Sequence, residues 1–156
     1  MEPDQTPQQP SAPVGLAPDV AGLGQRFLAR LIDGLIILVP NLLALAVAQD
    51  RPVFGGLLAL AIAIAYEVPQ LAARGATVGK RAMGIRVVTV AERGNPSAAQ
   101  AFVRVVVPEL FIATPSAALQ SISAPWTLAV YLAVFFDPWR RGLHDRFAGT
   151  RVVRDA

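Results

Sequence analysis

The chain has 156 residues, a length typical of one domain. Hydrophobic residues make up 54% of it and charged residues only 16%, with a mean hydropathy of +0.48. A soluble monomer of this size could not bury so much apolar surface, so the composition excludes an ordinary soluble enzyme, a coiled coil and a disordered chain. The absence of cysteine excludes disulfides and thiolate metal sites. The composition therefore predicts a membrane protein.

The positive charge lies in side chains that flank apolar segments. The net charge is +3, and 13 of the 14 basic residues are arginine. A nucleic-acid interface would gather these side chains on one surface, whereas here they separate the apolar runs. We therefore expect the lipid bilayer as the main partner, and no nucleic acid.

Residues 1–22 are rich in proline and glutamine and contain neither lysine nor arginine. Proline at this density disfavours helix, and the segment offers no apolar core. It also lacks the basic start and the apolar stretch of a secretory signal. We predict a disordered tail over residues 1–22, followed by one transmembrane domain over residues 23–156.

Two apolar runs, residues 31–48 and 53–73, are separated by a short polar turn. They hold 18 and 21 residues, and as helices they would be roughly 27 and 32 Å long at 1.5 Å per residue, enough to cross a bilayer. Because the turn between them is so short, we expect an antiparallel helical hairpin.

Residues 85–90 and 150–154 are rich in β-branched side chains. A single strand would expose unpaired backbone groups, so we expect these two segments to pair in a short cytoplasmic sheet.

The segment 102–136 is too long for one membrane crossing and short for two. With a cytoplasmic amino terminus, four crossings leave 13 of the 14 basic residues inside, whereas three crossings leave 8. The positive-inside rule therefore favours an even number, and a re-entrant pair would give the same sidedness. We predict an all-α membrane protein of four hydrophobic helices in two antiparallel hairpins. The second pair either crosses twice or is re-entrant, and both termini are cytoplasmic.

Three acidic residues interrupt the apolar runs: Asp33, Glu67 and Glu109. An ionisable group near the bilayer centre costs at least about 2.5 kcal/mol, so each needs a structural or functional reason. Asp33 lies 18 residues before Arg51, and Glu67 lies 16 residues after it. A hairpin therefore places Asp33 and Glu67 at similar depth, towards the cytoplasmic side.

Two interpretations of these acids remain open. Arg26 and Arg30 precede Asp33 by seven and three residues, on the same helical face. In the first interpretation these arginines neutralise Asp33 and anchor the start of the helix. In the second, Asp33 and Glu67 form a carboxylate site for a cation or a proton, as intramembrane acids do in transporters.

Residues 75–81 form a basic loop with two glycines. It differs from a nucleotide-binding loop, because three residues rather than four separate the glycines and Arg81 follows Lys80 where Ser or Thr is needed. We expect Lys80 and Arg81 to contact a lipid headgroup or a simple anion instead. His144 and Asp145 lack the partners of a metal site or a nucleophilic triad, so we predict local hydrogen bonds for them. We expect no metal, no cofactor and no enzymatic activity.

Three blocks of the sequence resemble, in their order and spacing, the RDD family of bacterial and archaeal membrane proteins. These blocks are residues 26–33, 75–88 and 141–150. The family is named for one arginine and two aspartates, which correspond here to Arg26, Asp33 and Asp145. Glu67 resembles a recurrent acidic position of the second helix, while Val78 stands where the family often has proline or leucine. The resemblance implies a membrane location, and transport of unidentified ligands has been suggested for the family.

We therefore expect a multi-pass protein of the bacterial plasma (inner) membrane that transports or binds a small ion or solute. Four short helices leave little room for a pathway within one chain, so we expect a homo-oligomer. The alternative is a non-transporting scaffold or regulatory subunit that binds a protein partner or anionic lipid. The candidate ligand or charge-network residues are Arg26, Arg30, Asp33, Glu67 and Asp145, with Lys80 and Arg81 as headgroup contacts.

Overall fold

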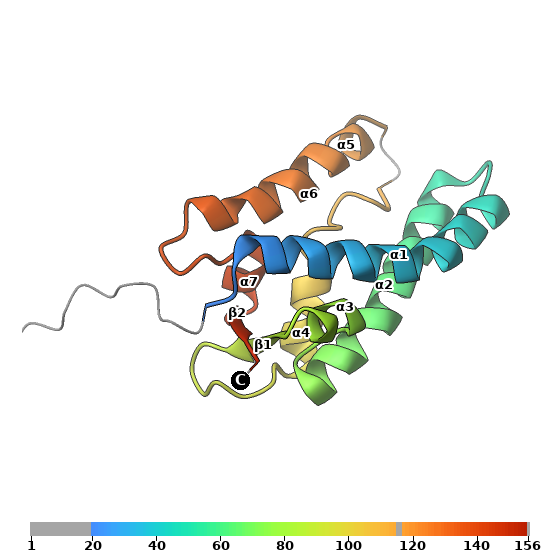
Figure 1. The fold of residues 1–156 in the computed structure, drawn as a ribbon. Helices are drawn as coiled ribbons and strands as arrows, with labels where there is room; N and C mark the ends of the chain where they lie inside the picture. The colour runs from blue at the N-terminus through green and yellow to red at the C-terminus, as the bar shows by residue number, and fades with distance from the viewer. Residues whose placement is uncertain (1–19, 115–116, 156) are drawn as a thin grey trace, which may run out of the picture.

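The computed structural model describes residues 20–114 and 117–155 (Figure 1). In these residues three helices are long and apolar enough to cross a membrane: α1 (Leu23–Val47), α2 (Pro52–Arg74) and the helical run Ala118–Phe135. Their large apolar side chains face outwards. On α1, for example, Leu35, Val39 and Leu43 are each more than 60% exposed, one helical turn apart. Contact between such an apolar stripe and lipid is favourable, whereas its exposure to water is unfavourable.

The first two helices form an antiparallel pair. α1 and α2 pack against each other and are joined by the turn at residues 48–51. With 25 and 23 residues, they are each about 35 Å long at 1.5 Å per residue, slightly more than the hydrocarbon thickness of a bilayer. At the end away from the turn, α1 begins before its apolar run, and Arg26 there donates to the carbonyl oxygen of Val152 in the small sheet (3.1 Å).

A compact cap forms at that end of the molecule. It contains α3 (Val78–Ala82), β1 (Ile85–Thr89), α7 (Leu143–Phe147) and β2 (Thr150–Arg154). β1 and β2 pair antiparallel, with Val87 opposite Val152, which confirms the predicted pairing of the two segments. The apolar core of the protein lies under this sheet, where Leu71 of α2, Ala29 of α1 and Ala101 pack with both strands.

The segment 102–136 contains one long helical run, and a fourth long apolar helix is not confirmed in the described residues. α4 (Ala98–Val106) begins with a capping box at Ser97 and packs along α2. Turns then continue to residue 114, after which α5 (Ala117–Ser121), α6 (Ser123–Leu132) and the 3₁₀ turn η1 (Ala133–Phe135) run back. Pro108 cannot extend α4, and its carbonyl accepts a hydrogen bond from the Thr127 hydroxyl of α6 (2.6 Å).

The turns after α4 lie close against α2. A Cβ atom at Gly56 would overlap the carbonyl oxygen of Ile112, so only glycine allows this approach. The Trp126 indole of α6 donates to the carbonyl oxygen of Val107 (2.8 Å) from the other side. The irregular segment is therefore held between α2 and α6, and two of its carbonyl oxygens, those of Val107 and Pro108, accept hydrogen bonds from side chains of α6.

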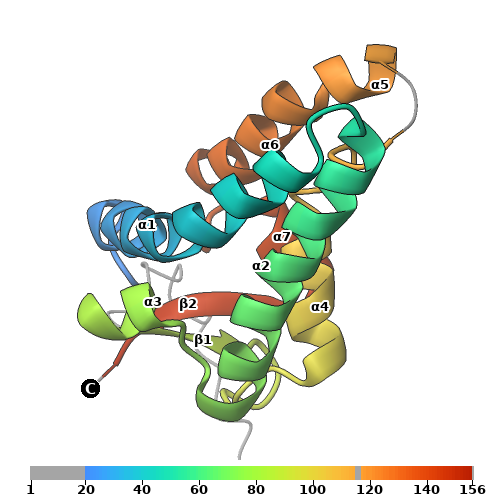
Figure 2. The ribbon, with the colours of Figure 1, turned by 90° about the vertical axis from the view of Figure 1, so that its right-hand side faces the viewer.

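The amino-terminal end of α1 and the carboxy-terminal strand lie together. The Ala21 amide donates to the carbonyl oxygen of Val152 (3.2 Å), and Val20 forms a bridge with Val153. Figure 2 shows the sheet and α3 at one end of the molecule, with α5 and the α1–α2 turn at the other. Most of the predicted tail, residues 1–19, lies outside the described residues, while residues 20–22 lead into α1 against the sheet.

Candidate functional site

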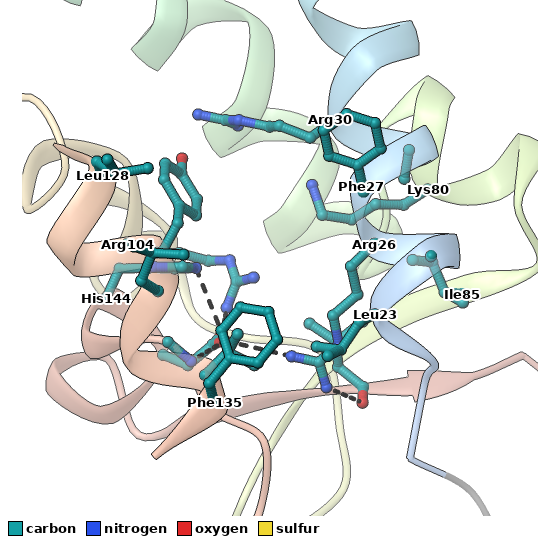
Figure 3. Close-up of a pocket in the computed structure, with 18 of the residues that line it drawn as sticks. Leu23, Arg26, Phe27, Arg30, Lys80, Ile85, Arg104, Leu128, Phe135 and His144 are labelled. Atoms are coloured by element: carbon teal, nitrogen blue, oxygen red, sulfur yellow. Dashed lines mark hydrogen bonds and ion pairs between the residues drawn. The ribbon is translucent and has the colours of Figure 1, made fainter. Parts of the chain in front are cut away.

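A cavity of about 700 Å³ lies between α1, the α6–η1 run and the cap. Figure 3 shows side chains of α1 and of α6–η1 on opposite sides of it, with Arg104 and His144 on the side of Leu128. We call the part lined by Arg26, Arg104, His144 and Asp145 the base of the cavity. Its walls are mainly apolar, while its ionisable lining residues are four cations, two carboxylates and one histidine. These are Arg26, Arg30, Lys80, Arg104, Glu67, Asp145 and His144.

Asp33 lies beside the cavity in a set of hydrogen bonds from three segments. One oxygen, Oδ1, accepts from the Tyr66 hydroxyl (2.8 Å) and from the Gly79 amide (2.7 Å). The other, Oδ2, accepts from the Thr77 hydroxyl (2.5 Å) and lies 3.7 Å from Lys80 Nζ. Asp33 is only 1% exposed, so these donors replace the water that its carboxylate loses.

The glycine at position 79 makes this arrangement possible. A Cβ atom there would overlap the carbonyl oxygen of Ala29 and would approach Asp33 Cγ to 2.8 Å. The basic loop expected to contact an anion therefore surrounds a carboxylate of the same chain. Lys80 is buried and faces Asp33, whereas Arg81 is exposed.

Arg30 and Glu67 form a second ion pair across the α1–α2 interface. Arg30 Nη1 donates to Glu67 Oε1 at 2.5 Å. The Glu67 side chain is 5% exposed and that of Arg30 is 40% exposed, so the arginine reaches from the buried acid into the cavity. Its guanidinium carbon also lies 5.2 Å from the centre of the Tyr131 ring on α6, a cation–π distance.

Asp145 joins the cap to α1 and α4. Its carboxylate pairs directly with Arg104 and lies 3.9 Å from Arg26 Nη1. It also accepts hydrogen bonds from the Gly142 amide (3.2 Å) and the Thr150 hydroxyl (3.3 Å). With its side chain 1% exposed, Asp145 is the buried centre of a network that links four segments.

The lining of the cavity carries more cations than carboxylates. Its four cations meet two lining carboxylates, those of Glu67 and Asp145, while Asp33 pairs with Lys80 from beside the cavity. Burial lowers the pKa of His144 well below its usual value, and nearby arginines lower it further, so His144 is neutral at pH 7. Burial also lowers the pKa of Lys80 to about 8, which leaves it mostly protonated. Glu109 interacts electrostatically with Arg30 but does not line the cavity.

Two buried nitrogens of the lining have no hydrogen-bond partner in the described part of the chain. They are Nε of Arg26 and Nδ1 of His144. The other nitrogens of Arg26 are used, since Nη1 donates to the carbonyl oxygen of Arg140 (2.6 Å) and Nη2 to that of Val152 (3.1 Å). A buried polar atom without a partner costs free energy, and a ligand or water in the cavity can supply the missing contact.

The model of the RDD family matches residues 20–149, which is most of the chain. The chain belongs to the RDD family. Comparison with curated proteins and with solved structures gives no match. The family assignment confirms the predicted resemblance and supports a membrane location for the apolar helices described above.

The three residues that correspond to the RDD family name occupy two places. Arg26 and Asp145 lie together at the base of the cavity, whereas Asp33 is bound by α3 and the loop before it. Of the two interpretations left open, the one in which Arg26 and Arg30 neutralise Asp33 is wrong. Those arginines bind other acids, because the hydroxyl of Thr77 and the amide of Gly79 fold over Asp33 and satisfy it instead. Glu67 and Asp33 likewise have separate partners.

Sequence analysis missed Arg104, His144 and Tyr131 as members of this site. Arg104 carried a usable signal, since a cation next to a long apolar run needs a buried partner. Among the described residues, no group of three or more histidine, aspartate or glutamate side chains is arranged to hold a metal ion.

Proposed function

We propose that this RDD-family protein is a multi-pass plasma-membrane protein that binds or transports a small anionic solute, with the cavity between α1 and α6 as its binding site. The observation that carries this proposal is the lining of the cavity, where four cations meet the two carboxylates of Glu67 and Asp145. We propose no enzymatic role. We also propose that both termini are cytoplasmic and that the protein works as a homo-oligomer.

An anion is favoured over the cation or proton of the carboxylate-site hypothesis. Asp33 already accepts three hydrogen bonds and contacts Lys80, and Glu67 is bound by Arg30. Neither acid has a free charge for a cation to neutralise. Arg26 and Arg104, in contrast, share the single carboxylate of Asp145. An incoming carboxylate or phosphate would balance the remaining charge in surroundings where charge interactions are strong.

Thermal unfolding of the purified protein in lipid nanodiscs tests this proposal. Octanoate should raise the melting temperature, because a ligand that binds only the folded state stabilises it by RT ln(1 + [L]/Kd). Octanamide and octylammonium, which have the same chain without the negative charge, should not. Equal stabilisation by octanoate and octanamide would contradict the proposal. A cation-dependent flux in proteoliposomes that Asp33→Asn abolishes in an assembled protein would favour the carboxylate-site hypothesis instead.

A matched pair of variants tests whether the stabilisation by octanoate arises in the cavity. The side chains of Arg30 and Arg86 are each 40% exposed, and each pairs with one acid, but only Arg30 lines the cavity. Arg30→Gln should remove the stabilisation by octanoate, whereas Arg86→Gln should retain it. Loss of the effect in both variants would indicate a general charge effect.

A scaffold or regulatory role is the second candidate, and a different surface favours it. A shallow cleft of about 360 Å³ on the sheet is lined by arginines from both strands and the loop after β1: Arg86, Arg93, Arg151 and Arg154. This surface suits an acidic protein segment or anionic lipid headgroups. Capture of a partner that depends on these arginines, with no binding of octanoate, would favour the scaffold.

A further inference from the structure

The apolar part of the cavity is formed by exposed side chains from two helices. Phe27 of α1 is 69% exposed, and Leu128 and Leu132 of α6 are 58% and 43% exposed, yet all three line the cavity. Phe135 at the end of η1 is 64% exposed and also lines it. α1 and α6 line the cavity from opposite sides (Figure 3) and do not pack closely against each other. The exposed apolar side chains of the lining therefore belong to two helices whose outer faces suit lipid.

Charged and apolar side chains lie side by side in the lining of the cavity. On α1, Phe27 follows Arg26, and on α6 Leu128 and Leu132 lie on either side of Tyr131. The guanidinium of Arg30 lies against the Tyr131 ring. A molecule that filled this space would need a negative head for the arginines and an apolar body for Phe27, Leu128 and Leu132.

We propose that the anion bound in the cavity is the head of a single-chain amphiphile, such as a long-chain carboxylate, which enters from the bilayer between α1 and α6. This inference rests on the proposed anion site and names its ligand class. The negative head binds Arg26, Arg30 and Arg104, and the chain lies against Phe27, Leu128 and Leu132.

The size and lining of the cavity favour this ligand over a bare inorganic anion. Its volume of about 700 Å³ lies in the range of roughly 300–1,000 Å³ that holds an organic ligand. A phosphate or acetate ion would leave the apolar wall uncovered beside charged groups that attract water. An alkyl chain covers that wall, and the bilayer already holds such chains at high local concentration.

Photo-crosslinking of the full-length protein in nanodiscs tests the inference. The probe is a 16-carbon fatty acid with a diazirine in mid-chain and a terminal alkyne. Mass spectrometry should locate the label on peptides that contain Phe27 and Leu128–Leu132. Palmitate should compete for labelling, whereas hexadecanol at the same mole fraction in the lipid should not.

Two substitutions separate the cavity from general lipid contact. Leu132→Trp fills the opening, and Leu38→Trp is the matched control, since Leu38 is 47% exposed on α1 and does not line the cavity. Leu132→Trp should lower specific labelling about tenfold, and Leu38→Trp should leave it unchanged. Leu128→Trp provides a second filling variant, and gel filtration checks that each variant is assembled.

The outcomes separate the inference from the proposed function. If acetate or phosphate competes as well as palmitate, or if the Leu132→Trp variant is labelled as strongly as the wild type, the ligand is not an amphiphile. The proposed anion site would then still stand. If hexadecanol competes as well as palmitate, the negative head is irrelevant, and both the inference and the proposed anion site are wrong.

Discussion

The hydrogen bonds around Asp33 predict a large cost for a substitution that hardly changes shape. Thr77→Val keeps the size of a side chain that is 0% exposed, but it removes the 2.5 Å bond from the Thr77 hydroxyl to Asp33. It also removes the acceptor for Lys80 Nζ at 3.1 Å. A hydrogen bond to a charged group contributes about 1.5–3 kcal/mol, so we expect a loss of about 2–3 kcal/mol in the free energy of unfolding.

Thr127→Val is the matched control for this prediction. Its hydroxyl donates over a similar distance, 2.6 Å, but to the neutral carbonyl oxygen of Pro108. The expected loss is about 1 kcal/mol, typical of a neutral hydrogen bond. Equilibrium unfolding of both variants in mixed micelles, followed by circular dichroism, measures the difference. If Thr77→Val unfolds within about 0.5 kcal/mol of the wild type, or costs no more than Thr127→Val, the charge-assisted role of Asp33 is refuted.

Three further predictions address the cap and the loop. Arg104→Met should destabilise the protein by about 3 kcal/mol or more, because it leaves Asp145 buried with a weaker partner, and adding Asp145→Asn should recover part of that loss in the same assay. If the losses in the free energy of unfolding caused by the two substitutions simply add, Arg104 and Asp145 do not interact as described. Because the pKa of His144 is lowered well below 6.5 in the folded state, the unfolded state binds more protons below that pH. Stability should therefore fall as pH drops below about 6.5, and His144→Gln should weaken this dependence; an unchanged pH profile would mean that His144 is not buried as described. Gly79→Ala should prevent stable assembly or lower the melting temperature strongly, since its Cβ would overlap the Ala29 carbonyl oxygen, and a wild-type melting curve would contradict this packing.

The elements that the sequence predicts well are those with a local pattern. The pairing of β1 with β2 follows from two short β-branched segments that each need a partner, and the observed antiparallel pair confirms the prediction. The two apolar runs predict the existence of α1 and α2 and the turn between them, whereas α1 begins at Leu23, before the run that starts at residue 31. The segment 102–136 is harder, because α4 ends at Val106 while the mainly apolar composition continues, and a nearby proline does not mark such an end by itself, since Pro40 and Pro69 lie inside α1 and α2.

The partners of the charged residues could not be read from local spacing. Arg30 lies three residues from Asp33 but binds Glu67, which is 37 residues away. Asp33 is bound by Thr77 and Gly79, 44 and 46 residues away, because folding brings their polar hydrogens to a carboxylate that is removed from water. Helical spacing identifies which residues share a face, while the strongest partner is chosen by tertiary packing.

The most direct test of the anion site measures the distance between a bound carboxylate and the guanidinium groups. In solid-state NMR of the protein in bilayers, octanoate labelled with ¹³C at its carboxyl carbon should show dipolar coupling to ¹⁵N-labelled arginine side chains at hydrogen-bonding distance. The coupling should vanish in Arg30→Gln and persist in Arg86→Gln. Bound octanoate without any coupling to arginine nitrogen would contradict an anion site at the base of this cavity.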